Sequence, residues 1–336
     1  MHSLRQEPMA VIGAGSWGTA LAIQLARAGH PTLLWGRDLA QLDAMRRARC
    51  NERYLPDAAF PDALNVAFEL EEALRGARDA LIAVPSHAFR TTLEHVARYL
   101  GEDTRIAWAT KGFESATGLL PHQVAGEVLG TRPGAVLSGP TFAREVGAGL
   151  PTAMTVASRD AVFARELAAR LSGPNFRAYR QSDIMGVEVG GAVKNVIAIG
   201  SGIADGMGFG ANTRVALITR GLAEMMRLGV QLGAARETFM GLAGLGDLVL
   251  TCTDDQSRNR RLGLALGRGR SMADAQNAIH QVVEGVLASR AVCAVAERLA
   301  VEMPICREVF RIMHEDKPVR EAVQELMGRE LRSETE

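Results

Sequence analysis

The feature that most constrains the fold is a strand that leads directly into a glycine-rich turn near the start of the chain. The apolar run Met9–Gly13 is typical of a buried strand, and residues 13–18 read Gly-Ala-Gly-Ser-Trp-Gly before a helical pattern begins. In this context Gly13 permits a tight turn, Gly15 lets the backbone approach a pyrophosphate, and Gly18 lets the helix pack against the strand. The helix N-terminus would then face an anion. An ordinary glycine-rich turn is the alternative, but the flanking strand and helix favour a dinucleotide site.

Strands and helices alternate through the first half of the chain. Candidate strands lie at Met9–Gly13, Pro31–Gly36, Asp79–Val84, Arg105–Thr110, Ala135–Ser138 and Thr152–Ala157. Amphipathic helical patterns occupy Thr19–Ala28, Leu39–Arg49, Ala88–Leu100 and Gly118–Leu129. This alternation predicts a mostly parallel, doubly wound sheet. We therefore expect an α/β Rossmann-type, NAD(P)-binding domain over residues 1–188.

The pattern changes after about residue 183, where no convincing strand appears. Apolar residues recur at helical spacing in Val187–Ile203, Thr213–Leu228, Val286–Leu299 and Ile305–Met313. This periodicity predicts amphipathic or buried helices. We expect an all-α, substrate-binding domain over residues 189–336.

Composition excludes several classes of protein. The chain has 38 basic and 38 acidic residues, so it lacks the basic excess of a general nucleic-acid or membrane-surface binder. Its four cysteines lie far apart, which argues against a disulfide framework or a zinc site, and we expect no metal. The first apolar run begins too early to follow a signal peptide, and no stretch approaches the ~18 uninterrupted apolar residues of a membrane span. We expect a cytoplasmic protein without stable membrane insertion; its oligomeric state stays open, with a homodimer as one option.

The basic residues are strongly biased, with 35 arginines and only three lysines. A GC-rich genome would produce such a bias, and a surviving lysine then marks a position where arginine cannot substitute. Arginine stays protonated, whereas lysine can be tuned to release a proton. Lys111 and Lys194 are therefore candidates for chemistry. Lys317 lies in a polar run and is most simply a solvated surface charge.

Lys194 lies in a long helical pattern that is rich in small residues. Gly190, Gly191 and Lys194 share one face by helical spacing, and this face could admit a cofactor or substrate. Apolar neighbours would partly desolvate Lys194 and lower its pKa toward a useful acid–base range. The alternative is a lysine that extends to solvent.

Other candidate residues follow the predicted strands. Arg37 follows the second strand and suggests recognition of the 2′-phosphate of NADP, although a surface cation is the alternative. Asp38 could cap the next helix. Lys111 could reach a substrate phosphate or carbonyl. Gly139 and Thr141 could hold ligand oxygens, although that segment taken by itself favours a simple turn.

Two polar segments interrupt the helical half. Residues 241–247 form a glycine-rich run that could present the Asp247 carboxylate at a tight turn. Ser257, Arg258 and Asn259 offer hydroxyl, guanidinium and amide groups together, which suits a phosphate. A solvated polar helix start is the alternative for this second segment.

Taken in order, these segments resemble bacterial NAD(P)-dependent sn-glycerol-3-phosphate dehydrogenases. The resemblance covers residues 9 to about 290, and its motifs are GAGSWGTALA, VPSH, ATKG, LSGPTFA, GAVKNVIAIGSGIADGMGFGANTRVALITRGLAEM, GLAGLGDLVLTC, SRNRRLG and QVVEG. The segment from Gly191 to Met225 is the most specific of these.

The resemblance implies roles for individual residues. The positions that match the family's cofactor contacts are Ser16, Trp17, Arg37, Lys111, Ala143, Arg258, Val282 and Glu284. Those that match its substrate contacts are Lys111, Gly139, Thr141, Lys194, Asp247, Ser257, Arg258 and Asn259. Lys194 matches the proton-transferring lysine, with Asp247 and Lys111 as further catalytic candidates.

The activity implied is reversible reduction of dihydroxyacetone phosphate to sn-glycerol 3-phosphate, which supplies the glycerol backbone of phospholipids. The cofactor would be NADP or NAD, and Arg37 favours NADPH. Two other functions compete with this expectation. One is a related reductase of a 3-hydroxy acid or ketopantoate, and the other is a regulator that senses NADPH without turning it over.

Overall fold

Strand β1, Met9–Ile12, lies inside the sheet and is buried on both faces. In the computed structural model, which describes residues 7–279 and 281–330, Met9 and Val11 pack into one apolar cluster and Ala10 and Ile12 into another. Alternate residues of a strand point to opposite faces, so each face has its own core. This two-sided burial explains why the strand reads as an uninterrupted apolar run.

The main sheet has eight strands in the order β10-β9-β8-β7-β6-β1-β2-β5. After β1 they are β2 (Thr32–Trp35), β5 (Leu64–Val66), β6 (Asp79–Ile82), β7 (Arg105–Trp108), β8 (Gly134–Ser138), β9 (Thr152–Ala157) and β10 (Phe176–Gln181). Neighbouring strands are parallel except β8 and β9. From β1 the first strands of the chain, β2 and β5, are added on one side of β1. The later strands, β6 to β10, are added on its other side. The boundary between β1 and β6 is therefore the switch point at which ligands bind such sheets.

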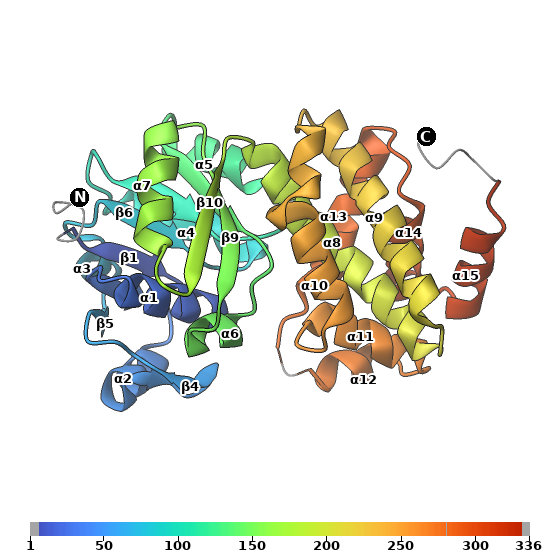
Figure 1. Ribbon diagram of the computed structural model, residues 1–336, viewed down its shortest axis with the longest axis horizontal. Coiled ribbons are helices and arrows are strands. Elements are labelled where there is room, and N and C mark those ends of the chain that lie inside the picture. The colour runs from blue at the N-terminus through green and yellow to red at the C-terminus, as the bar shows by residue number, and fades with distance from the viewer. Residues whose placement is uncertain (1–6, 280, 331–336) are drawn as a thin grey trace.

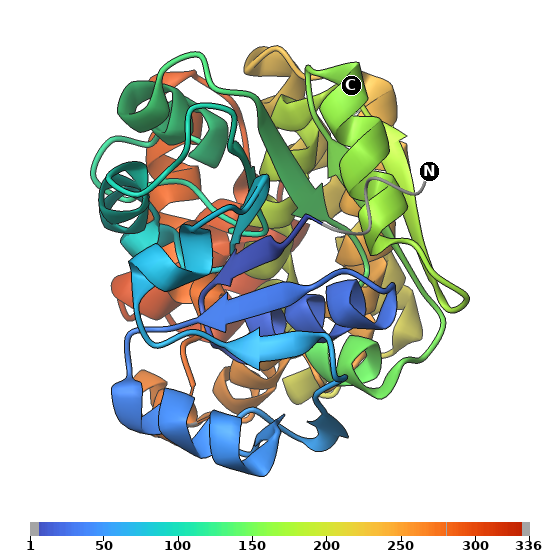
Figure 2. The ribbon, with the colours of Figure 1, turned by 90° about the vertical axis from the view of Figure 1, so that its left-hand side faces the viewer.

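Helices cover both faces of this sheet (Figure 2). They are α1 (Ser16–Arg27), α2 (Leu39–Ala48), α3 (Leu70–Leu74), α4 (Ser86–Ala97), α5 (Pro121–Leu129), α6 (Ala143–Ala148) and α7 (Ala161–Leu171). Residues of α1 and α7 belong to one apolar cluster, and residues of α3, α4 and α5 to the other. A separate hairpin of β3 (Cys50–Asn51) and β4 (Leu55–Ala59) follows α2.

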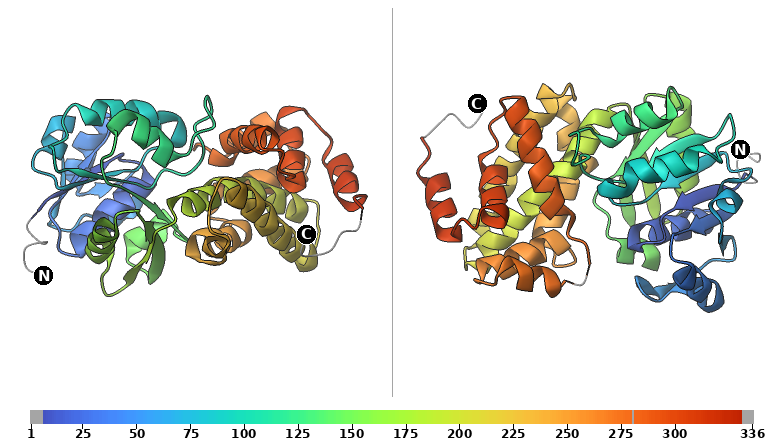
Figure 3. Two further views of the ribbon diagram at one scale, coloured as in Figure 1. Left: turned by 90° about the horizontal axis from the view of Figure 1, so that it is seen from above. Right: turned by 180° about the vertical axis from the view of Figure 1, so that it is seen from behind.

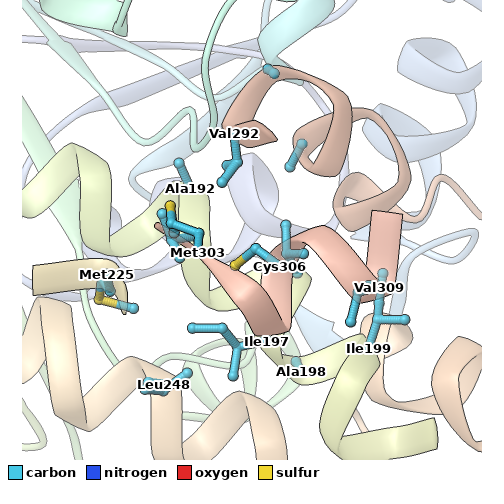
Figure 4. Packing of buried hydrophobic residues seen from close by; sticks show 14 of the residues in the cluster. Ala192, Ile197, Ala198, Ile199, Met225, Leu248, Val292, Met303, Cys306 and Val309 are labelled. Atoms are coloured by element: carbon cyan, nitrogen blue, oxygen red, sulfur yellow. The ribbon is translucent and has the colours of Figure 1, made fainter. Parts of the chain in front are cut away.

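Helix α8, Ile184–Gly206, joins the sheet domain to a helical domain, which forms a second lobe (Figures 1 and 3). The other helices are α9 (Ala211–Gln231), η2 (Arg236–Met240), η3 (Leu242–Gly246), α10 (Asp247–Thr253), α11 (Arg258–Gly267), α12 (Met272–Asn277), α13 (Glu284–Arg298), α14 (Pro304–His314) and α15 (Val319–Met327). Figure 4 shows residues of α8 packed with those of α9, α10, α13 and α14. Helix α8 is apolar and long enough to cross a bilayer, but 94% of its most apolar window is buried inside the protein.

Glycines bring α11 directly against α8. A Cβ at Gly202 would collide with the Arg260 carbonyl, and one at Gly263 would collide with the Ile199 carbonyl. Glycine permits such close backbone approach because it has no Cβ. The contact fixes the first residues of α11 relative to the middle of α8.

All six expected strands are present, and the architecture predicted from the pattern is confirmed. The expectation missed β3, β4, β5 and β10, and it also missed α7, α12, α15 and several other helices of ten residues or fewer. Strand β10 lies at the sheet edge and most of its residues are partly or fully exposed, so it lacks an apolar run. The division between residues 188 and 189 stays a prediction; it falls within α8, which begins at Ile184.

Candidate active site

The glycine-rich turn between β1 and α1 is closely packed at Gly13 and Gly18 but open at Gly15. Gly13 has a φ of +123°, and a Cβ there would collide with the Ala83 carbonyl. A Cβ at Gly18 would collide with the Gly13 carbonyl, so both glycines are required for packing. A Cβ at Gly15 would meet nothing within 4 Å. The open space at Gly15, beside the N-terminus of α1, fits the pyrophosphate of a dinucleotide.

A cavity lies where the carboxyl edge of the sheet meets the helical domain. Its lining comes from the α1 N-terminus, the loops after β7 and β8, the β3–β4 hairpin, and helices α8, α10, α11 and α13. The lining residues are Ser16, Trp17, Tyr54, Leu55, Ala109, Lys111, Thr141, Phe142, Ala143, Arg144, Lys194, Asn195, Asp247, Thr251, Gln256, Ser257, Arg258, Asn259, Arg261, Gln281 and Glu284. The cavity therefore joins the expected cofactor side to the expected substrate side.

Two lysines share one buried carboxylate at this cavity. Lys194 Nζ lies 2.5 Å from Asp247 Oδ1, and Lys111 Nζ lies 2.6 Å from Asp247 Oδ2. Lys194 also donates to Thr251 Oγ1 at 3.0 Å. Lys194 is only 7% exposed and Asp247 only 1%. The alternative of a lysine that extends to solvent is therefore wrong for Lys194.

The environment of Lys194 makes its ammonium easy to deprotonate. Burial lowers its pKa from the usual lysine value to about 8, and the nearby Lys111 ammonium acts in the same direction. The Asp247 carboxylate opposes this by favouring the charged form. Burial alone would raise the pKa of Asp247, but the two lysines outweigh it and hold that pKa below its ordinary value. Lys194 can therefore donate or accept a proton near neutral pH.

The short helix η3 presents Asp247 to the lysines, and two glycines of α8 make room for it. A Cβ at Gly190 would lie 2.5 Å from the Ala243 carbonyl oxygen, and one at Gly191 would lie 3.3 Å from Lys111 Cγ. The expectation of a ligand contact is therefore wrong for Gly190 and Gly191, whereas Lys194 on the same face does line the cavity. Gly190 receives the loop that carries Asp247, and Gly191 receives the side chain of Lys111.

The start of α11 is more structured than a solvated helix end. Ser257 and Asn259 are both buried, and Ser257 Oγ accepts a hydrogen bond from Arg260 N at 3.2 Å. Asn259 donates to Asn195 Oδ1 at 2.8 Å and accepts from Gly285 N at 2.9 Å. Arg258 is half-buried in the cavity wall.

Several sequence-predicted residues lie at the edge of the cavity or away from it. Arg37 is exposed at the end of β2 and does not line the cavity, and Asp38 caps α2 by accepting from Gln41 N. Val282 is 50% exposed, and its carbonyl accepts from Arg258 Nη1 at 2.9 Å. Gly139 packs its backbone against Met154 and does not line the cavity.

Lys317 differs from the expectation for a solvated charge. Its ammonium lies 2.6 Å from Glu308 and 2.8 Å from Glu325, and the side chain is only 11% exposed.

In the described part of the chain, no group of three or more His, Cys, Asp or Glu side chains is placed to hold a metal ion.

Sequence reasoning missed some cavity residues. Tyr54 and Leu55 come from the unpredicted β3–β4 hairpin. Thr251 follows Asp247 by four residues in a helix, so this spacing could have indicated it. Asn195 directly follows Lys194 in α8, and adjacent helix residues point in different directions, so spacing gave no signal for it. No local pattern indicates that Tyr54 reaches the cavity.

Comparisons with known proteins agree with this geometry. The N-terminal and C-terminal profiles of NAD-dependent glycerol-3-phosphate dehydrogenase match residues 8–164 and 183–324. The glycerol-3-phosphate dehydrogenase, NAD(P)+, of Edwardsiella ictaluri is 57% identical over 328 residues, which are 97% of each chain. The crystal structure of a glycerol-3-phosphate dehydrogenase from Coxiella burnetii is 49% identical, with a TM-score of 0.94, and the match covers 97% of this chain and all of that one.

A ketopantoate reductase family structure from Ralstonia eutropha shares the fold alone. It is 15% identical with a TM-score of 0.59, and the match covers 95% of this chain and 99% of that one. By contrast, the two profile matches and the 57% identity over the full length are far closer than this 15% identity, and they identify the family. The chain belongs to the NAD-dependent glycerol-3-phosphate dehydrogenase family.

Proposed function

We propose that this protein catalyses the reversible NAD(P)H-dependent reduction of dihydroxyacetone phosphate to sn-glycerol 3-phosphate. The observation that carries the proposal is a buried lysine, Lys194, held by Asp247 and Thr251 on the wall of the cavity that reaches the glycine-rich turn. Membership of the family supports the substrate. We assign cofactor binding to residues 1–188 and most substrate contacts to residues 189–336.

Lys194 is the proposed general acid. The bound nicotinamide would supply the hydride, and negative charge would develop on the substrate oxygen as it arrives. The Lys194 ammonium stabilises that charge and donates its proton to the oxygen. In oxidation the neutral amine accepts the proton. Asp247 orients Lys194 and Lys111 by binding one ammonium with each carboxylate oxygen.

The remaining side chains provide binding. Arg258 is the proposed phosphate ligand, because its guanidinium can form charge-assisted, paired hydrogen bonds with phosphate oxygens. Asn259 bonds to Asn195 and Gly285, so we assign it the role of holding the start of α11 in place. Ser16, Trp17 and Ala143 are the proposed cofactor contacts in the cavity wall, and Gly15 offers the space for the pyrophosphate.

A steady-state assay tests this proposal against its competitors. Oxidation of NADPH or NADH should depend on dihydroxyacetone phosphate and should be far slower with ketopantoate or a 3-oxo acid. Faster turnover of a carboxylate substrate would overturn the choice of substrate. Cofactor binding without any turnover would instead indicate a sensor. We further propose a cytoplasmic enzyme whose product enters phospholipid synthesis.

We predict that Arg37→Ala weakens NADPH binding much more than NADH binding. Arg37 follows β2, where the adenosine ribose lies in such folds, and its exposed guanidinium is free to meet a 2′-phosphate. Dissociation constants for the two cofactors, measured by fluorescence titration, check this. Equal losses for both would show that Arg37 does not recognise the 2′-phosphate.

We predict that Arg258→Ala raises KM for dihydroxyacetone phosphate by about tenfold to a hundredfold. A hydrogen bond to a charged group is worth about 1.5–3 kcal/mol. Arg261→Ala is the matched control, since Arg261 also lines the cavity wall on α11; its effect on KM should be smaller. An unchanged KM in Arg258→Ala would move the phosphate elsewhere, with Lys111 as the next candidate.

A further inference from the structure

The carbonyl of Ala14, in the middle of the glycine-rich turn, is held by two side chains from separate elements. Gln41 Nε2 of α2 donates to it at 2.9 Å, and Asn51 Nδ2 of β3 donates to it at 3.1 Å. A carbonyl oxygen has two lone pairs, so both are used. Asn51 is fully buried, and its amide also donates to Thr19 Oγ1 at 2.8 Å. We call Gln41 and Asn51 the carbonyl clamp.

The clamp fixes the direction of the next N–H group. In a trans peptide the C=O and the following N–H lie in one plane and point in opposite directions, and the described chain has no cis peptide bond. The Gly15 N–H must therefore point away from Gln41 and Asn51. It donates no backbone hydrogen bond within residues 7–279 and 281–330, and the space beside Gly15 is open.

We propose that Gln41 and Asn51 are positioning residues that aim the Gly15 N–H at the cofactor pyrophosphate. One donor would be enough to satisfy the buried Ala14 carbonyl. Two donors from different elements also restrict rotation of the Ala14–Gly15 peptide plane. Neither side chain lines the cavity, so they act through the backbone. This inference rests on the proposed function, since it requires a dinucleotide at the turn.

Isosteric apolar variants separate positioning from packing. Gln41→Met and Asn51→Leu remove the donors without adding charge. Gln24→Met is the matched control, because Gln24 Nε2 also donates to a backbone carbonyl, that of Leu171, at 2.8 Å, and lies on α1 away from the turn. The probe is ADP-ribose, which carries the pyrophosphate but no nicotinamide, titrated by calorimetry.

Each clamp variant should weaken ADP-ribose binding by about two- to tenfold, the effect of one neutral hydrogen bond. The double variant should lose more than tenfold. NADPH and NADH should lose affinity by the same factor, unlike in Arg37→Ala. Gln24→Met should leave ADP-ribose binding unchanged even where its melting temperature falls.

Unchanged ADP-ribose affinity in Gln41→Met would overturn the clamp. Gln41 is only half-buried, so this variant decides the matter even where Asn51→Leu fails to fold. An equal loss in Gln24→Met would overturn it as well, since the effect would then be general destabilisation. Failure of the unmodified protein to bind ADP-ribose would overturn the dinucleotide site itself, which distinguishes the two ideas.

Discussion

Replacing Lys194 with methionine should lower kcat for dihydroxyacetone phosphate reduction by ~10²–10⁴, the usual contribution of a positioned general acid. Methionine keeps the length of the side chain in this buried site but has no proton to donate. NADPH affinity should change little, because the cofactor phosphates would lie at the glycine-rich turn. Steady-state kinetics and a fluorescence titration with NADPH measure the two quantities separately.

Lys194→Arg distinguishes proton transfer from charge stabilisation. Arginine keeps the positive charge but does not release its proton near neutral pH. A purely electrostatic role leaves this variant substantially active, whereas proton transfer predicts near-complete loss. Lys317→Met is the control, since it removes a lysine of similar low exposure that is paired with Glu308 and Glu325 outside the cavity. Unaltered turnover in folded Lys194→Met would show that the acid lies elsewhere, with Lys111 the first alternative.

The parts of the fold that could be predicted are those that leave a recognisable pattern in consecutive residues. Gly13 and Gly18 serve contacts within the turn or with the adjacent strand, and β1 is apolar throughout because it is buried on both faces. Strand β10 could not be predicted, because an edge strand with exposed residues has no run of apolar residues. Its place in the sheet depends on pairing with β9.

The active site was predictable as a set of residues but not as an arrangement. Residue type and context marked Lys111, Lys194 and Asp247 separately. Their pairing joins positions 136 and 53 residues apart, which no local spacing encodes. The same limit led to the wrong interpretation of Gly190 and Gly191: small residues on a helix show that something approaches closely, and only the structure shows that it is the loop before Asp247 and the side chain of Lys111.

Replacing Asp247 with asparagine should impair both stability and catalysis. Removing one partner of a buried ion pair costs about 3–5 kcal/mol, and here two ammonium groups would lose their shared carboxylate. We expect kcat/KM for reduction at pH 8 to fall by ~10², within the contribution of general acid catalysis. Chemical denaturation and steady-state kinetics measure the two losses.

The pH dependence identifies the cause of the catalytic loss. In the unmodified enzyme, kcat/KM for reduction should fall as pH rises through about 8, because only the Lys194 ammonium can donate a proton, and kcat/KM for oxidation should rise over the same range. The Asp247 carboxylate raises the pKa of Lys194, so its removal lowers that pKa and moves both limbs to lower pH. Asp205→Asn is the control, because this carboxylate also holds two cations, Arg214 and Arg260, within the helical domain. Asp205→Asn should lose stability while the pH profiles of kcat/KM still change near pH 8. If the profiles of Asp247→Asn also still change near pH 8, Asp247 does not set the proton affinity of Lys194.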